Sequence, residues 1–281
     1  DFVHPIRPEP ILPWTRPEAQ DQFVAEVCTV DGLQAIAGYA QAGCAVAGRT
    51  IDLPFTDGQK RNYGLFDGTS GCYISTSDSA VLRVTGDIEI IVYATATDWT
   101  PVAAYTFVSK WDTTGNKRSY MLEMNPSGLL IIDTSVGGTG ATVVTTIATV
   151  ATGFTDGTGH WIRATLDVNN GAGGSDYKFY TSNDPVTTAP ASVSWMQLGA
   201  TVTVASTTSI FAGTAPLEIG TRNAGVAAPV NGKIYHTQVY NGIGGTLVAD
   251  FNANLWVSGS TLPAPSGEVY TINGTASIVV A

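Results

Sequence analysis

Residues 159–168 read Gly-His-Trp-Ile-Arg-Ala-Thr-Leu-Asp-Val, and residues 88–96 read Ile-Glu-Ile-Ile-Val-Tyr-Ala-Thr-Ala. In the first stretch every second residue from Ile162 to Val168 is apolar, and the residues between are Arg, Thr and Asp. The same period runs from Ile88 to Ala94. Because successive side chains of a strand point to opposite faces, both stretches are predicted to be half-buried strands, with Glu89 on the solvent face.

The same two-residue period continues to the end of the chain from about residue 64. Further strands are predicted at 105–110, 120–124, 129–133, 177–181, 233–240, 247–251, 269–272 and 276–280. Turn dipeptides are found at 67–68, 127–128, 156–157, 231–232, 241–242 and 273–274, and the last should close a terminal hairpin. Many short strands without intervening helices favour an all-β fold of two packed antiparallel sheets; a closed barrel is the alternative.

The first 63 residues have a different character. Five prolines lie in residues 1–17, a composition that predicts an extended arm; a disordered tail or linker is the other interpretation. Thr15 and Glu18 match a capping box, so one short helix is expected over about 16–28. We therefore expect an N-terminal anchoring segment at 1–63 and the sandwich at 64–281.

Composition limits the classes of partner. The chain has 281 residues, 23 acidic against 13 basic, a formal net charge of −10, and no cluster of Lys or Arg. Since nucleic-acid binding depends on cations set against phosphates, no nucleic-acid partner is expected. No apolar run approaches the ~20 residues of a membrane helix, so no membrane insertion is expected either. Cys28, Cys44 and Cys72 include no Cys-x-x-Cys pair, which argues against structural zinc.

Catalytic motifs are sparse. The histidines at 4, 160 and 236 stand far apart in the sequence, and no Gly-x-Ser-x-Gly nucleophile motif occurs. A glycosidase needs two carboxylates ~5–9 Å apart, and the nearest match, Asp87-x-Glu89, lacks a third acid. The Gly-rich segment 169–174 leads from strand to strand, so it is interpreted as a hairpin loop rather than a phosphate cradle. We expect no enzymatic activity and no cofactor.

Residues 159–182 join the strand quoted first, the Gly-rich loop and Tyr-Lys-Phe-Tyr-Thr-Ser at 177–182. This strand pair is similar to one in laminin-G-like (concanavalin A-like) jelly-roll domains, in the version seen in minor tail and other structural proteins of bacteriophages infecting actinobacteria. Segments that agree in order are 66–74, 85–90, 108–112, 118–120, 195–199, 210–220 and 232–235. The resemblance covers about residues 64–281.

The resemblance implies a jelly-roll sandwich that contacts glycans or proteins, sometimes with calcium. We therefore expect a virion structural protein from the tail, a fibre or the capsid surface, oligomeric in the particle. Its arm would contact other virion proteins, and its loops would contact host-surface glycans. The alternatives are a secreted glycan-binding module and a glycoside hydrolase.

Four residues are the candidate ligand-binding site. Trp99 lies in a polar stretch between strands and is the best candidate for an exposed sugar-stacking ring; Trp111, Asp112 and Asn116 lie in a second inter-strand turn. Trp195 and Trp256 could also stack on sugars, although packing is the commoner role of such rings. Trp161 is expected in the core.

Calcium is compatible with the acidity but is not indicated by any motif. Asp67, Asp112 and Asp133 are the possible donors, and none has diagnostic spacing. Asp67 is more simply explained as part of a turn, because Gly68 follows it.

Overall fold

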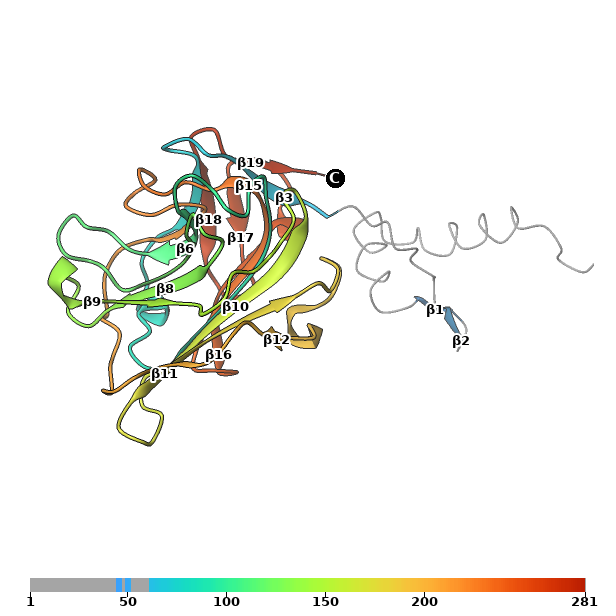
Figure 1. Cartoon of the computed structure of the whole chain (residues 1–281). Helices are drawn as coiled ribbons and strands as arrows, with labels where there is room; N and C mark the ends of the chain where they lie inside the picture. The colour runs from blue at the N-terminus through green and yellow to red at the C-terminus, as the bar shows by residue number, and fades with distance from the viewer. Residues whose placement is uncertain (1–43, 47–48, 52–60, 281) are drawn as a thin grey trace, which may run out of the picture. The chain divides into compact units, whose positions relative to one another are not determined.

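The computed structural model describes residues 44–46, 49–51 and 61–280 (Figure 1). The chain divides into two units, with the boundary between residues 59 and 60. In the first unit β1 (Cys44–Val46) pairs with β2 (Arg49–Ile51). The second unit holds all the other strands. The predicted arm and the predicted helix at 16–28 lie outside the described residues.

The second unit is built from two antiparallel sheets. The nine-stranded sheet, called sheet I, contains in spatial order β12 (Met196–Gln197), β11 (Ser175–Ser182), β10 (Gly159–Asp167), β5 (Ile88–Ala96), β15 (Asn231–Asn241), β3 (Tyr63–Asp67) and β19 (Ser277–Val279). Two further strands complete it, β13 (Val202–Val204) beside β11 and β16 (Thr246–Asn252) beside β15. The long strand β15 therefore pairs with β5 along one side, and with β3 and then β16 along the other.

The eight-stranded sheet, sheet II, packs against sheet I. Its order is β17 (Thr261–Pro263), β18 (Val269–Asn273), β4 (Tyr73–Thr76), β14 (Leu217–Ile219), β6 (Tyr105–Lys110), β7 (Tyr120–Met124), β8 (Leu130–Ser135) and β9 (Val143–Ile147). The helical elements of the described residues are short 3-10 turns: η1 (Ala80–Leu82), η2 (Gly140–Thr142), η3 (Pro190–Ser192) and η4 (Ala253–Leu255). None of the helices in these residues could span a membrane. The predicted all-β, two-sheet sandwich is confirmed.

The core forms where the inward rows of the two sheets meet. On β5 the even positions from Ile88 to Ala96 point inward, and on β10 the inward row includes Ile162 and Leu166. Leu122 of sheet II joins the same apolar cluster, and all these side chains are buried. Each fully buried aliphatic side chain stabilises the fold by about 1.5–3 kcal/mol. Burial of the apolar rows that the alternation predicts is therefore the main driving force for packing the two sheets together.

The expected strands are largely found where the period placed them. The predicted strands 105–110 and 120–124 coincide with β6 and β7. The Gly-rich segment 169–174 connects β10 to β11, as expected of a hairpin loop. Trp161 is buried as predicted, on the outward side of sheet I beneath a surface loop.

Two Asn-Gly dipeptides do not have the predicted role. Asn231 and Gly232 are the first residues of β15, not a turn. A Cβ on Gly232 would lie 2.3 Å from the carbonyl oxygen of Thr95, so the glycine permits β5 to approach. Gly274 does form a turn, but the flanking strands are not a hairpin: β18 pairs with β4 in sheet II, whereas β19 pairs with β3 in sheet I.

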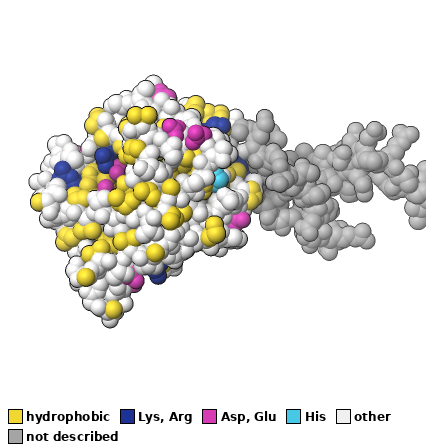
Figure 2. All heavy atoms as spheres, viewed as in Figure 1, with side chains coloured by type: hydrophobic (Ala, Val, Ile, Leu, Met, Phe, Trp, Pro, Cys, Tyr) yellow, Lys and Arg dark blue, Asp and Glu magenta, His cyan; other side chains and the backbone are white. Residues whose placement is uncertain are grey.

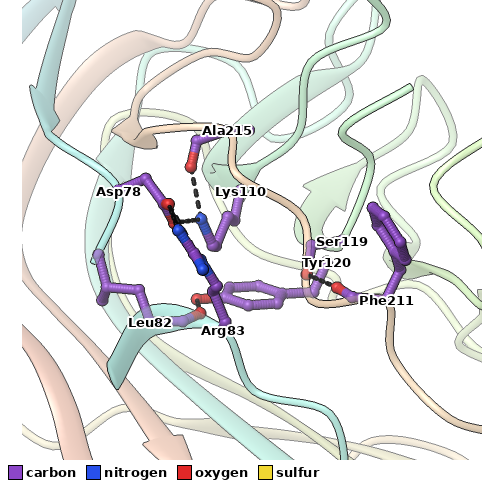
Figure 3. A network of polar contacts seen from close by, with 8 residues as sticks. All are labelled: Asp78, Leu82, Arg83, Lys110, Ser119, Tyr120, Phe211 and Ala215. Atoms are coloured by element: carbon purple, nitrogen blue, oxygen red, sulfur yellow. Dashed lines mark hydrogen bonds and ion pairs between the residues drawn. The ribbon is translucent and has the colours of Figure 1, made fainter. Parts of the chain in front are cut away.

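A buried ion network ties the segment 78–83 to sheet II (Figure 3). The side chain of Lys110 is fully buried, and its Nζ donates to Asp78 Oδ1 and to the carbonyl oxygen of Ala215, each at 2.5 Å. Asp78 Oδ2 lies 2.5 Å from Arg83 Nη2. Burial disfavours the charge on Asp78, but the hydrogen bonds from Arg83 and Lys110 outweigh it, and the pKa of Asp78 lies below its ordinary value. The carboxylate is therefore the counter-charge that allows a lysine inside the sandwich.

Replacing Asp78→Asn should lower the free energy of unfolding by about 3–5 kcal/mol, because the Lys110 ammonium would remain buried without a compensating charge. The double variant Asp78→Asn, Lys110→Met should recover most of this loss. Urea unfolding of the three proteins measures both effects. A loss below about 1 kcal/mol in the single variant would show that the pair does not hold the segment.

Candidate functional site

Trp99 is not the exposed ring that the sequence suggested. Its side chain has 0% exposure and belongs to the main core. Its Nε1 donates to the Thr158 carbonyl oxygen at 3.1 Å, its backbone N–H donates to Asp156 Oδ1 at 2.8 Å, and its ring packs edge-on against Phe154. The polar residues around Trp99 in the sequence cap a buried side chain, so the expectation that it is exposed is wrong.

The other three predicted site residues share the turn between β6 and β7. Trp111 is 5% exposed, Asp112 is partly exposed, and Asn116 is exposed with φ +54°. The Asp112 carboxylate accepts from the Thr114 backbone at 2.8 Å. This turn is joined to the loop at 222–228, because the Asn223 backbone N–H donates to the Trp111 carbonyl oxygen. Trp99 makes its contacts with a different part of the chain, so the structure does not bring all four residues together.

The three possible calcium donors lie on separate elements. Asp67 ends β3 and accepts from the Thr69 backbone at 2.9 Å, which is a turn interaction. Asp133 is buried on β8, and Asp112 lies in the β6–β7 turn. Within the described part of the chain no group of three or more His, Cys, Asp or Glu side chains is arranged to hold a metal ion.

The outward side of sheet I carries a concentration of aromatic side chains that strand alternation places on one surface. Trp161 of β10 lies opposite Tyr93 of β5, and both are buried at the base. Around them are partly exposed rings, and together these form what we call the aromatic face: Tyr63, Tyr180, Trp195, Tyr235 and Tyr240. Only Trp195 among the partly exposed rings was a sequence candidate. The others could have been found by asking which tyrosines occupy outward strand positions.

Arg163 is fixed in the middle of this face. Its Nε lies 2.9 Å from Glu89 Oε1, and its guanidinium carbon lies 4.9 Å from the ring centroid of Tyr180 and 5.7 Å from that of Trp195. The other Glu89 oxygen accepts from the Gly244 backbone N–H at 2.7 Å. Glu89 is therefore only 5% exposed, and the prediction that it lies on the solvent face is wrong. Its position is outward, but the arginine and the β15–β16 turn cover it.

A second set of polar groups runs along β15 and β16 on the same face. Tyr240 Oη donates to Gln238 Oε1 at 2.7 Å, and Gln238 Nε2 donates to Asp250 Oδ1 at 3.4 Å. His236 Nε2 lies 2.6 Å from the same carboxylate oxygen. These side chains restrain one another, so their remaining donors and acceptors are presented in fixed directions.

The outward side of sheet II holds three buried acids, Glu123, Asp133 and Glu218, of which only Asp133 was a candidate from the sequence, as a possible calcium donor. Glu218, Ser109, Met121 and Asp133 are register partners in one row across four strands. Glu123 lies nearby on β7 and binds Arg222 at 2.8 Å. Burial raises the pKa of Glu123 and of Asp133 above the ordinary values of these groups.

Glu218 anchors the loop at 222–228. Its carboxylate accepts from the backbone N–H groups of Ala224 at 2.8 Å and Gly225 at 3.2 Å. Asn223, Ala224 and Ala228 all have positive φ, a backbone region unfavourable for non-glycine residues. Burial raises the pKa of Glu218 to about 7 from 4.5, and the two backbone hydrogen bonds only partly oppose it.

A carboxyl group whose pKa is higher in the folded state than in the unfolded state binds its proton more tightly when folded. Ionisation of Glu218 therefore lowers the free energy of unfolding as pH rises from 4.5 to about 7, and above this window the loss is about 3 kcal/mol. Glu218→Gln should flatten the fall in stability over this window and stabilise the protein at pH 8, measured by urea unfolding at several pH values. Glu218→Ala, which also removes the acceptor for the loop, should be less stable than Glu218→Gln at every pH. An unchanged pH slope in Glu218→Gln would contradict this assignment.

Charge on the surface is sparse. On the face shown in Figure 2, the Lys and Arg side chains lie in small separate groups and form no continuous basic patch.

No protein-family model and no curated protein matches the chain. Among solved structures, the chain is similar to the CBM40 domain of Ruminococcus gnavus IT-sialidase bound to α2,3-sialyllactose (16% identity, TM-score 0.44, 63% of this chain and 90% of that one). It is also similar to domains LG4-5 of the mouse laminin α1 chain (14% identity, TM-score 0.39, 69% and 47%). A third is full-length tailspike protein 2 of an Escherichia coli bacteriophage (15% identity, TM-score 0.33, 66% and 27%). With all three TM-scores below 0.5, these likenesses determine neither a ligand nor an activity for this chain, and the jelly-roll sandwich follows from its own strand pairing.

Proposed function

We propose that this protein is a non-catalytic recognition module that binds carbohydrate on the aromatic face of sheet I. The observation that carries the proposal is the combination of partly exposed rings with hydrogen-bonding groups fixed between them. A sugar ring has an apolar C–H side that packs on aromatic faces and hydroxyls that need both donors and acceptors. The aromatic face offers both in one surface.

Arg163 is the central donor in this proposal. Its guanidinium is held by Glu89 and lies near the rings of Tyr180 and Trp195, so it keeps its orientation without a ligand. A donor that is already oriented loses little conformational entropy when a ligand binds. Sugar hydroxyls seated on Trp195 would therefore meet a preorganised cation.

The network along β15 and β16 supplies the complementary groups. His236 is partly exposed and is oriented by Asp250, and Tyr240 is oriented by Gln238. His236 and Tyr240 lie two strands away from Arg163, because their neighbour Gln238 on β15 pairs with Ile91 of β5, which pairs with Arg163 of β10. The spacing suits an extended glycan that crosses the strands.

The proposal includes no reaction. Hydrolysis of a glycosidic bond needs two carboxyl groups, one of them protonated to serve as an acid. In the Asp87 and Glu89 pair, Glu89 Oε1 is ion-paired with Arg163, Glu89 Oε2 accepts from the Gly244 backbone N–H, and Asp87 Oδ1 accepts from the Val168 backbone at 2.9 Å. These acids have structural partners that already account for their presence.

Trp195→Ala and Tyr180→Ala should each weaken glycan binding at least about tenfold, because each removes a stacking surface beside Arg163. A glycan array identifies the ligand, and calorimetry on the best hit measures the loss. Tyr73→Ala, on the outward side of sheet II, is the matched control and should bind as the unaltered protein does. Absence of glycan binding, or binding indifferent to both variants, would overturn the proposal, as would sugar release abolished by Glu89→Gln.

We further propose that the module is a structural component of a bacteriophage particle. The support is the ordered sequence resemblance over about residues 64–281 to structural proteins of such particles. In this proposal residues 1–63 anchor the chain to neighbouring virion proteins, and the sandwich presents the aromatic face to host-surface glycans. Assembly into an oligomer follows from the symmetry of such particles.

Immunogold labelling with an antibody to the sandwich should decorate intact particles at a regular position. A variant lacking residues 1–30 should remain folded but fail to enter particles, whereas Trp195→Ala should be incorporated normally. Unlabelled particles would contradict the location, and normal incorporation of the truncated variant would contradict the anchoring role.

A further inference from the structure

A pocket lies beside the β17–β18 edge of sheet II, away from the aromatic face. Its volume is about 370 Å³. Residues 76–81, running from the end of β4 into η1, form one wall, and residues 266–269 at the start of β18 form the other. Small-molecule sites in proteins span about 300–1,000 Å³, so this pocket is at the small end of that range.

Asp78 makes the first wall rigid and electrically balanced. Figure 3 shows its carboxylate between Lys110 and Arg83, and both of its oxygens are engaged. Lys110 is fully buried, and its ammonium would have no counter-charge if the Asp78 carboxylate moved away. The ion pair therefore holds the carboxylate in place. A ligand at this wall therefore meets carboxylate oxygens in fixed positions. Their charge is already balanced by Arg83 and Lys110, so the ligand need not bring a cation.

The second wall has acceptors that the protein leaves available. Glu268 is 7% exposed, and its Oε2 accepts from the Ser266 hydroxyl at 2.5 Å, but Oε1 has no hydrogen bond or ion pair within residues 61–280. Across the pocket, Ser77 is exposed and contributes its hydroxyl to the lining.

Two valines give the pocket an apolar rim. Val81 and Val269 line it and are 55% and 53% exposed. The lining thus alternates hydroxyls and carboxylates with methyl groups. A molecule that carries hydroxyls on its edge and C–H groups on its faces matches this pattern.

We propose that this pocket binds a single neutral sugar residue. Its hydroxyls hydrogen-bond to Glu268 and Ser77, and its C–H face contacts Val81 and Val269. An acidic sugar is disfavoured because the lining contains two carboxylates, Asp78 and Glu268, which would repel the negative charge of the sugar. A metal ion is disfavoured because Asp78 is already neutralised by two cations and the described residues hold no cluster of metal ligands. The site is separate from the aromatic face and does not depend on it.

Saturation-transfer NMR of the full chain tests the proposal. The probes are the methyl glycosides of glucose, galactose, mannose and N-acetylglucosamine, with the methyl glycoside of N-acetylneuraminic acid as the acidic counterpart. At least one neutral glycoside should bind saturably, with a dissociation constant of about millimolar order, as expected for so small a ligand. The acidic glycoside should bind at least about tenfold more weakly.

Ser77→Trp blocks the pocket without disturbing a buried group, because Ser77 is exposed and lines it. It should weaken the binding of the neutral glycoside at least about tenfold, and Glu268→Gln should weaken it by a similar factor. Ser206→Trp, at an exposed serine outside the pocket, is the matched control and should change nothing.

The double variant Trp195→Ala, Tyr180→Ala separates this proposal from that for the aromatic face. Neutral-sugar binding that persists in the double variant and disappears in Ser77→Trp supports the pocket. Binding lost in the double variant but retained in Ser77→Trp overturns the pocket proposal and leaves the aromatic face standing. Absence of saturable binding by all four neutral glycosides also overturns it.

Discussion

The constraint on which the structure depends is that β5 has no side exposed to water for most of its length. Its inward row packs into the core between the sheets, and its outward row, with Glu89, Ile91 and Tyr93, is covered as well. A strand with polar or charged outward residues can be covered only if each such residue finds a partner. Arg163 and the β15–β16 turn meet that requirement for Glu89, and the ring of Tyr93 packs edge-on against the ring of Trp161.

Because the outward row of β5 is covered as well, the outward side of sheet I differs from a sheet face that is exposed to solvent. Trp161 donates to the Pro185 carbonyl oxygen, which holds the loop after β11 over the sheet, and Val193 of that loop joins the same small apolar cluster. Aromatic rings at its margin are then left partly exposed on a rigid base. A rigid base is what a carbohydrate-binding surface requires, because weak polar contacts are useful only if little entropy is lost in making them.

Sheet II manages its charges differently. Lys110 points into the sandwich and is neutralised there by Asp78, whereas Glu123 and Glu218 point outward and are covered by the loop at 222–228. The loop adopts unfavourable positive φ values to place its N–H groups and Arg222 over these acids. The polar groups of the neighbouring pocket follow from the same arrangement, since the ion network that neutralises Lys110 also fixes one pocket wall.

What the sequence by itself determined was the two-residue period, and from it the strands, the all-β class and individual elements such as β6 and β7. An Asn-Gly dipeptide predicted a turn correctly only where the chain reverses its direction. Asn-Gly at 273–274 specifies a tight turn but not the partner of the next strand, and at 231–232 the glycine serves a close approach of β5 instead. The burial of Trp99 and of Glu89 could not be read from their neighbours, because each is covered by residues more than fifty positions away. Tertiary structure alone decided which outward residues share a surface, since strand order brings together side chains that no sequence interval relates.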